Sequence, residues 1–229
     1  MDVMLSLSKK STKVISANYV QEYESIFKCP ICHSAMCVSK LTSLVCVDNH
    51  TFDFAKQGYL NLLTRPVKAK YSKELFEARR KLLVEDRFFD PLLQAIAKVI
   101  KKQSKRKSAP LFILDTGCGE GSPLSELCQM VSSELNTTVV GVGIDLSKEG
   151  ILTASKNYAK KIWCVADLAH TPFKDKHFDV ILNILSPSNY AEFNRLLKDD
   201  GFVIKVVPGG SYLKELREKT NITVEQAAS

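Results

Sequence analysis

The stretch LFILDTGCGEG at residues 111–121 is an apolar run of strand length that enters a turn containing three glycines. Pro123 follows, at a position suited to the first turn of a helix because its missing N–H is not needed there. The glycines let the backbone bend sharply and let a ligand approach it closely. A Gly-x-Gly-x-Gly loop between a strand and a helix therefore predicts a nucleotide cofactor, without choosing among several.

Downstream of this loop, strand-length apolar runs alternate with helix-length segments. The expected strands cover 111–114, 138–144, 162–165, 178–185 and 202–207, and the expected helices cover 123–134, 148–158 and 190–197. Strands that alternate with helices imply right-handed crossovers and a mainly parallel sheet with both faces covered. The predicted fold class is therefore α/β.

Acidic residues follow the first three expected strands. Asp145 ends the second strand, where its carboxylate is suited to accept hydrogen bonds from ribose hydroxyls, and Asp167 follows the third, within reach of an adenine amine. Asp115 and Glu120 lie in the first loop, where negative charge repels a pyrophosphate and suits a cationic sulfonium and its ammonium group. Each carboxylate alone is as typical of a helix cap or a solvated loop. The ordered set favours S-adenosylmethionine over NAD.

A second signal lies upstream, in a short segment rich in cysteine. Its candidate zinc ligands are Cys29, Cys32, Cys46 and His50. Zinc takes four sulfur and nitrogen ligands in a tetrahedron, and residues 36–45 form a plausible hairpin between the two halves. Four protein ligands leave no position for water, so the predicted site is structural, and metal binding would supply much of the folding free energy of so small a module.

Two other residues of this segment could substitute as ligands but fit less well. Cys37 has no partner at the same spacing, and His33 directly follows Cys32, so its side chain is expected to point elsewhere. The alternative to a zinc site is a set of unrelated buried cysteines beside a surface histidine. The paired spacing favours the zinc site.

Composition limits the class of protein. The chain has 229 residues with 32 Lys+Arg against 25 Asp+Glu, a formal net charge of +7, and 45% hydrophobic residues. This is a globular composition whose positive charge favours polyanionic partners, nucleic acid first. No apolar run approaches the ~20 residues of a membrane-spanning helix, and the first ten residues lack the order of a signal peptide. We therefore expect a cytoplasmic protein with no membrane partner, whose seven cysteines are not disulfide-bonded.

Changes in composition divide the chain into four parts. Residues 1–27 are expected to form a frayed arm ending in a short helix, 28–64 the zinc-binding module, 65–109 a basic helical connector, and 110–229 the domain with the glycine loop. Within the connector, helical patterns cover 74–84 and 91–100. The connector residues expected to contact nucleic-acid phosphates are Lys68, Lys70, Arg79, Arg80 and Lys81; their alternative is a solvated helix face.

Several motifs occur together and in a fixed order: the cysteine pairs, FDFAKQGYLNLL at 52–63, ARR at 78–80, and the loop at 115–121. In this combination the chain resembles the 23S rRNA (guanine-N1)-methyltransferase family, whose Gram-positive members include a tylosin-resistance methyltransferase. The resemblance covers residues 27–215, roughly. It implies a class I (Rossmann-like) S-adenosylmethionine-dependent methyltransferase domain behind a small zinc-binding module that helps to recognise a 23S rRNA hairpin.

The resemblance also assigns site residues. It implies that Cys29, Cys32, Cys46 and His50 bind zinc, and that an aromatic residue, Phe89, and a residue near the end of the chain, Tyr212, lie beside the cofactor. Together with the residues reasoned above, the expected cofactor-binding set is Phe89, Asp115, Gly117, Gly119, Gly121, Pro123, Leu124, Asp145, Asp167 and Tyr212.

The implied reaction is methylation of guanine N1. This nitrogen lies on the Watson–Crick edge, so the target base must be unpaired or extruded from a loop. It carries a proton at neutral pH, and the general base that removes it is not identified. Asn183 and Ser186 are the substrate-facing candidates, in a loop without the Asn-Pro-Pro-Tyr-like motif expected for methylation of an exocyclic amine.

The chain departs from the family pattern at three places. Thr116 replaces a larger apolar residue, 198–201 replaces the usual turn before the fifth strand, and we expect the domain to lack its last strands because the family continues for some forty residues beyond Ser229. Two alternatives therefore stay open: a catalytically impaired relative that binds zinc and RNA, and a small-molecule methyltransferase. Homodimer formation and antibiotic resistance are also left open.

Overall fold

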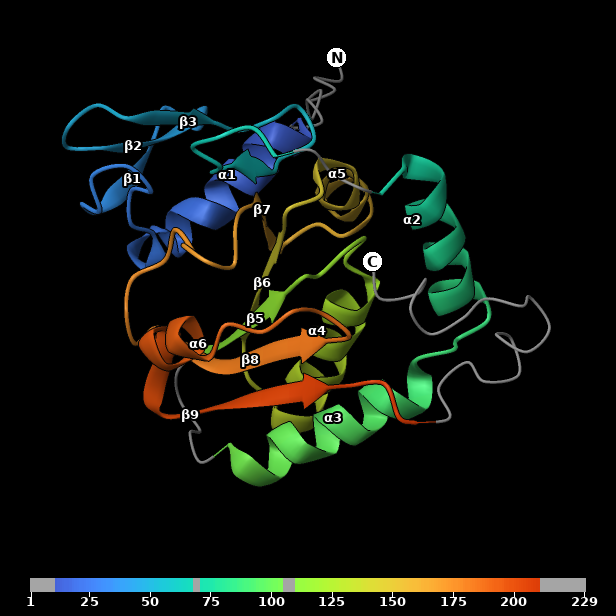
Figure 1. Ribbon diagram of the computed structural model, residues 1–229. Helices are drawn as coiled ribbons and strands as arrows, with labels where there is room; N and C mark the ends of the chain where they lie inside the picture. The colour runs from blue at the N-terminus through green and yellow to red at the C-terminus, as the bar shows by residue number, and fades with distance from the viewer. Residues whose placement is uncertain (1–10, 68–70, 105–109, 211–229) are drawn as a thin grey trace, which may run out of the picture.

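The computed structural model describes residues 11–67, 71–104 and 110–210, and it contains one large and one small β-sheet (Figure 1). The large sheet has six strands in the order β4-β7-β6-β5-β8-β9, and every neighbouring pair is parallel. Its strands are β4 (Leu60–Asn61), β5 (Leu111–Thr116), β6 (Val139–Asp145), β7 (Ile162–Val165), β8 (Phe178–Ile184) and β9 (Leu197–Val206). The small antiparallel sheet contains β1 (Met36–Ser39), β2 (Ser43–Cys46) and β3 (Thr51–Asp53).

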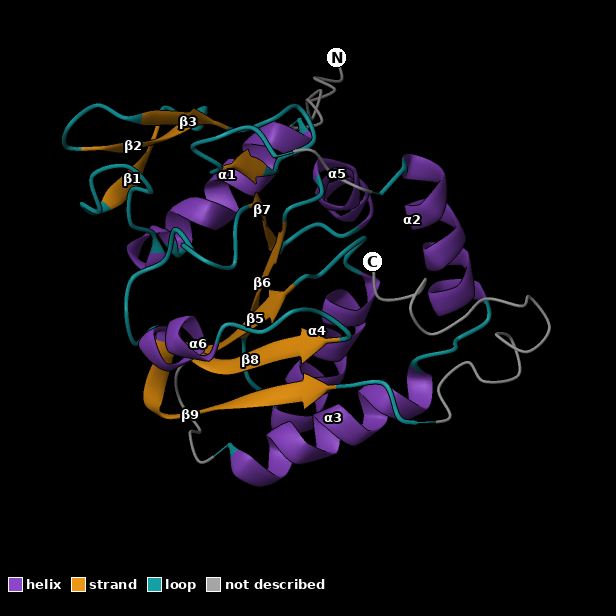
Figure 2. Cartoon of the chain, viewed as in Figure 1, coloured by secondary structure: helices purple, strands orange, loops and turns teal. Residues whose placement is uncertain are grey.

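The helices are drawn in purple in Figure 2. They are α1 (Thr12–Glu22), a 3-10 turn (Glu24–Ile26), α2 (Lys73–Arg80), a π-helical turn (Lys81–Glu85), α3 (Asp90–Gln103), α4 (Ser122–Leu135), α5 (Lys148–Asn157) and α6 (Tyr190–Leu196). Ser72 caps α2 and Ser147 caps α5 by accepting a hydrogen bond from a backbone N–H of the first turn. The predicted α/β alternation is confirmed, with boundaries shifted by one to three residues for most elements.

Alternate residues of each central strand enter two different cores, one on each face of the large sheet. Ile113 of β5 packs in the core formed with α3, α4 and α5, where Leu93, Leu127 and Ile151 are buried. The next residue, Leu114, belongs to the opposite core. This arrangement is a three-layer α/β sandwich, as expected for a parallel sheet whose strands are buried on both sides.

The second core is filled largely by the N-terminal part of the chain. Its members include Ala17 of α1 and Leu44 of β2 together with Val142 of β6 and Cys164 of β7. The connection from β7 to β8 contains no helix among the described residues, and residues 26–28 pair with residues 172–174 instead: Lys28 N–H donates to the Pro172 carbonyl at 3.1 Å, and Lys174 N–H donates to the Ile26 carbonyl at 2.8 Å. The N-terminal part thus supplies a layer of the sandwich.

Three features differ from the sequence expectations. The short helix expected at the end of the N-terminal arm is α1, but it is packed into the fold rather than peripheral, with Ala17 and Val20 buried. Strand β4 from the zinc-binding module extends the large sheet beside β7, which the sequence did not indicate. The irregular stretch at 198–201 is part of β9, at a register shift where β8 and β9 pair at Phe178–Leu197 and next at Val180–Phe202. Residues 211–229 lie outside the described part, so the expected loss of the last strands is not tested.

Among the described residues, no helix combines the length and the apolar character needed to cross a lipid bilayer.

Candidate functional site

The four predicted zinc ligands come together at the end of strand β2, on which Cys46 lies. One ligand atom from each of Cys29, Cys32, Cys46 and His50 lies within 4.8 Å of all the others. The Sγ atoms of Cys32 and Cys46 are 3.6 Å apart, and His50 Nδ1 is 3.6 Å from Cys29 Sγ and 3.5 Å from Cys46 Sγ. Ligands on a tetrahedral zinc ion with bonds of about 2.0–2.3 Å lie about 3.3–3.8 Å from one another. The distances therefore fit a structural zinc ion.

The two other candidates in this segment lie outside the cluster. Cys37 is exposed on β1, and its thiol faces the Val45 carbonyl at 3.7 Å. His33 adopts a left-handed backbone conformation with φ of 63° as the chain leaves the first cysteine pair. The cluster uses all four positions of a tetrahedron, so it stabilises the fold and is not suited to bind a reacting molecule.

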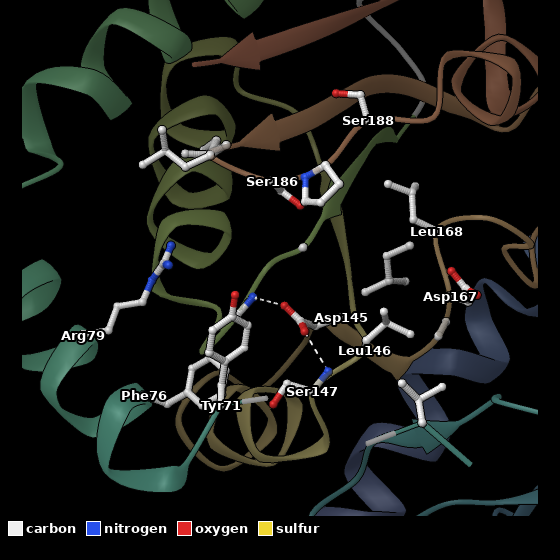
Figure 3. A pocket seen from close by; sticks show the side chains of 18 of the residues that line it. Tyr71, Phe76, Arg79, Asp145, Leu146, Ser147, Asp167, Leu168, Ser186 and Ser188 are labelled. Carbon is white, nitrogen blue, oxygen red and sulfur yellow. Dashed lines mark hydrogen bonds between the residues drawn. The ribbon is translucent and has the colours of Figure 1, made fainter. Parts of the chain in front are cut away.

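A large cavity lies at the carboxyl ends of the parallel strands. Its volume is about 1250 Å³, and it is lined by the segments that follow β5, β6, β7 and β8, with α2 on the opposite side. Figure 3 shows this arrangement, with Phe76 of α2 and Tyr71 of the segment before it on one side and Leu168 on the other. Strand β5 lies where the chain order reverses in the sheet, which is where doubly wound folds bind their ligands.

Asp145 at the end of β6 organises the glycine loop. One carboxylate oxygen accepts a hydrogen bond from the Gly119 N–H at 2.9 Å, and the other accepts from the Ser147 N–H at 2.7 Å (Figure 3). Gly117 and Gly119 both have positive φ, and both line the cavity. A side chain at Gly117 would overlap Ser186, so the absence of a β-carbon lets the loop after β8 approach the glycine loop closely.

Three carboxylates gather around the glycine loop. Burial raises the pKa of Asp115 to about 7, with Arg79 acting to lower it and the neighbouring Asp145 and Glu120 adding to the rise. Burial also raises the pKa values of Asp145 and Glu120, and Arg79 lowers both. Glu120 is fully buried and accepts a hydrogen bond from the Ser122 hydroxyl at 2.6 Å. The site is therefore acidic, and a cation bound in it would be stabilised.

The buried side chain of Asn183 supports the loop after β8 through hydrogen bonds. Its amide group donates to Thr116 Oγ1 at 3.0 Å and to the Pro187 carbonyl at 2.8 Å, and its oxygen accepts from Lys205 Nζ at 2.9 Å. Leu185 follows in a left-handed conformation with φ of 51°, a strained state for a bulky residue that is often found at functional sites. Ser186 lines the cavity, whereas Asn183 is buried beneath the loop.

The structure divides the predicted cofactor residues into three groups. Gly117, Gly119, Asp145 and Asp167 line the cavity. The following residues are buried and do not line it: Phe89, Asp115, Gly121, Pro123 and Leu124. Gly121 is needed for packing, because a β-carbon there would lie 2.6 Å from Trp163 Cη2. Tyr212 lies outside the described residues.

Sequence reasoning missed the contribution of α2 to the cavity. Arg79 and Arg80, expected to face RNA, are both half-buried, and Arg79 lines the cavity. Lys81 is exposed, and Lys68 and Lys70 lie outside the described residues. The helical spacing of Leu75, Arg79 and Leu82, all of which line the cavity, was the available signal.

Both parts of the chain match known protein families. Residues 27–73 match the family described as "RlmA, N-terminal", and residues 113–201 match the family described as "Methyltransferase domain". With the topology above, the second match identifies a class I S-adenosylmethionine-dependent methyltransferase fold.

Relatives match across both parts. A Bacillus subtilis protein named "Putative 23S rRNA (guanine-N(1)-)-methyltransferase YxjB" is 53% identical over 195 residues, which cover 85% of this chain and 68% of that protein. The 23S rRNA (guanine(748)-N(1))-methyltransferase of Streptomyces fradiae is 30% identical over 190 residues, which cover 82% of this chain and 65% of that protein. The chain thus spans about two thirds of the length of these relatives. On the identity and coverage shared with the Bacillus subtilis protein, the chain belongs to the 23S rRNA (guanine-N1)-methyltransferase family.

Proposed function

We propose that this protein transfers a methyl group from S-adenosylmethionine to N1 of a guanine in a hairpin loop of 23S rRNA, in the cytoplasm. The observation that carries the proposal is the cavity of about 1250 Å³ at the strand ends. Pockets for a single small molecule usually measure about 300–1,000 Å³. The cavity therefore has room for a nucleoside cofactor and for a nucleobase beside it.

The charges around the glycine loop suit this cofactor. When bound, S-adenosylmethionine supplies a methyl group made electrophilic by its positively charged sulfur. Asp145 and Asp167 line the cavity, and Asp115 and Glu120 lie behind it. These carboxylates attract a sulfonium and an ammonium group, and they disfavour a pyrophosphate. We assign Asp145 to the ribose hydroxyls and Asp167 to the adenine amine.

The mouth of the cavity suits an extruded base. Tyr71 and Tyr190 are 58% and 59% exposed while lining the cavity, and aromatic side chains in such positions stack on bases taken out of a helix. Ser186, in contact with Gly117, can donate a hydrogen bond to the edge of the guanine. Orienting the nitrogen, the methyl carbon and the sulfur in line can itself lower the barrier by about 7–11 kcal/mol.

The RNA part of the proposal is supported by the relatives and by charge. Both relatives described above carry names that specify 23S rRNA and guanine N1. The formal net charge of +7 favours a polyanionic substrate. The zinc-binding module, which shares a core with the large sheet, is the part we assign to the RNA hairpin.

Primer extension on 23S rRNA, purified from cells with and without the gene, tests the proposal. A methyl group on N1 blocks base pairing, so we expect a reverse-transcriptase stop at one guanine only when the protein is present. The same stop should appear when purified protein and S-adenosylmethionine are added to unmodified rRNA. Asp145→Asn is the control, since it removes one acceptor from the glycine loop and should abolish the stop.

Other results would identify the alternatives. Labelled methyl groups found only in a small-molecule fraction would indicate a small-molecule methyltransferase. A protein that binds zinc and RNA but shows no heat of binding with S-adenosylmethionine would be a relative without catalytic activity.

A further inference from the structure

Arg79 is the one cationic side chain among the described residues that line the cavity. It lies in the last turn of α2, in the connector between the zinc-binding module and the glycine loop. A β-carbon built on Gly119 would lie 3.9 Å from both Cζ and Nε of Arg79, so the guanidinium group rests directly over the glycine loop. Figure 3 shows Arg79 on the α2 side of the cavity.

The surroundings of Arg79 leave its donors available for a ligand. Three carboxylates lie near Arg79. Asp145 accepts from the Gly119 and Ser147 N–H groups, and Glu120 accepts from Ser122. Asp115 is buried near the end of β5, where Arg79 acts on it only through its charge. Among the hydrogen bonds and ion pairs formed between described residues, none engages the Arg79 guanidinium. A guanidinium has five N–H donors in a planar fork that matches a carboxylate.

The proposed cofactor presents such a group. Its amino-acid tail carries a carboxylate as well as an ammonium, and the tail must lie along the glycine loop if the methyl group is to reach the mouth of the cavity. A carboxylate there would be repelled by Asp145 and by the acidic groups behind the loop, unless a cation offsets them. Among the described residues that line the cavity, Arg79 supplies that positive charge, and its guanidinium lies over the glycine loop.

We propose that Arg79 binds the α-carboxylate of the S-adenosylmethionine tail through a bidentate hydrogen-bonded ion pair. This inference rests on the proposed function, and it adds a cofactor-binding residue that lies outside the glycine-loop domain. It also means that the connector completes the cofactor site, because Arg79 can reach the loop only while α2 lies against it. The nearby Arg80, whose Nε is buried beside Tyr158 rather than in the cavity, is not part of this site.

Decarboxylated S-adenosylmethionine tests the inference, because it differs from the cofactor by the carboxylate alone. Calorimetry would measure the affinity of the full-length zinc-loaded protein and of Arg79→Gln for both molecules. We expect the unmodified protein to bind the complete cofactor about 10–100-fold more tightly than the decarboxylated one. Arg79→Gln should lose this preference while retaining its affinity for the decarboxylated molecule, and Arg79→Lys should keep part of it.

The controls separate this inference from others. Lys81→Gln removes one positive charge from the exposed turn after α2 and should keep the full preference. If Arg79→Gln lowers the affinity for both molecules equally, or for neither of them, the inference is wrong. If it leaves both of these affinities intact and lowers only the affinity for RNA, Arg79 contacts phosphate instead. If the unmodified protein binds neither molecule, the proposed function itself fails.

Discussion

Asp115 is a single buried carboxyl whose titration affects the stability of the whole fold. Burial raises its pKa from the ordinary 3.8 to about 7. Between these two values the folded chain keeps a proton that the unfolded chain has lost, so the free energy of unfolding falls as pH rises. The slope from this one group is at most about 1.4 kcal/mol per pH unit.

We expect Asp115→Asn to remove this contribution. The amide is nearly isosteric with the protonated carboxyl and carries no charge at any pH, so the variant should gain stability relative to the unmodified protein as pH rises from 5 to 8. Urea unfolding at each pH unit measures the difference. Asp86→Asn, at an exposed position, is the control and should give parallel profiles. Parallel profiles for Asp115→Asn as well would contradict the prediction.

At the residue scale, the zinc ligands were predictable and the role of Arg79 was not. The local spacing of the cysteines is enough to indicate a metal site, because a tight turn places two sulfur atoms on one side of a metal ion. Arg79 looks like one of several basic residues in the connector. Its place over Gly119 depends on how α2 packs, which no local pattern encodes. Asn183 was expected to face the substrate, but its amide donates hydrogen bonds to Thr116 and Pro187 and supports the loop instead. This arrangement also depends on tertiary packing.

Helix α2 is held on the glycine loop by one aromatic ring. Phe76 is 5% exposed, and β-carbons built on Gly119 and Gly150 would lie 3.6 Å and 3.0 Å from its ring atoms. The two glycines therefore leave the space that the ring occupies. Since Arg79 is on the same helix, the position of the ring also determines whether Arg79 can reach the cavity.

Phe76→Ala is expected to release α2 without unfolding the sheet. Loss of a buried phenylalanine costs about 3–5 kcal/mol in a closed core, and here the loss falls on one short helix. Hydrogen exchange of the amides in α2 should become at least ~10-fold faster, while β5, β6 and β8 stay protected, and cofactor affinity should fall. Leu75→Ala, at a half-exposed position on the same helix, should change exchange little. Unchanged exchange in both variants would mean that other contacts hold α2.

At the element scale, long periodic segments were predicted well and short ones were missed. The apolar runs that became β5, β6, β7 and β8 are buried on both faces, so most residues in them are hydrophobic. Strand β4 contains only Leu60 and Asn61, and it exists because β7 offers an unpaired edge. A two-residue strand has no pattern of its own. Its place follows from the tertiary structure.

At the scale of the whole molecule, the zinc-binding module and the large sheet share a hydrophobic core, and we expect them to fold as a single unit. Val38 and Leu44 of the small sheet share a core with Val142 and Cys164 of the large one. Loss of zinc should therefore lower the stability of both. Trp163, the only tryptophan of the chain, lies on β7 and reports on the large sheet.

We expect removal of zinc by a chelator, or the substitution Cys46→Ser, to lower the melting temperature seen by Trp163 fluorescence. The transition seen by far-UV circular dichroism should shift with it, because one cooperative unit unfolds in one step. Cys37→Ser changes an exposed cysteine of the same module and should leave both transitions in place. A Trp163 transition that stays constant while the small sheet unfolds would show two independent domains.

The docking of α1 and residues 26–28 onto the far side of the sheet has a consequence for biosynthesis. These residues are made before the strands that bury them, since Ala17, Val20 and Phe27 share a core with Val142 of β6 and Cys164 of β7. These residues can reach their final positions only after β6 and β7 have left the ribosome, and their apolar side chains stay exposed until then. During that interval, chaperones that bind nascent chains have the opportunity to contact this segment.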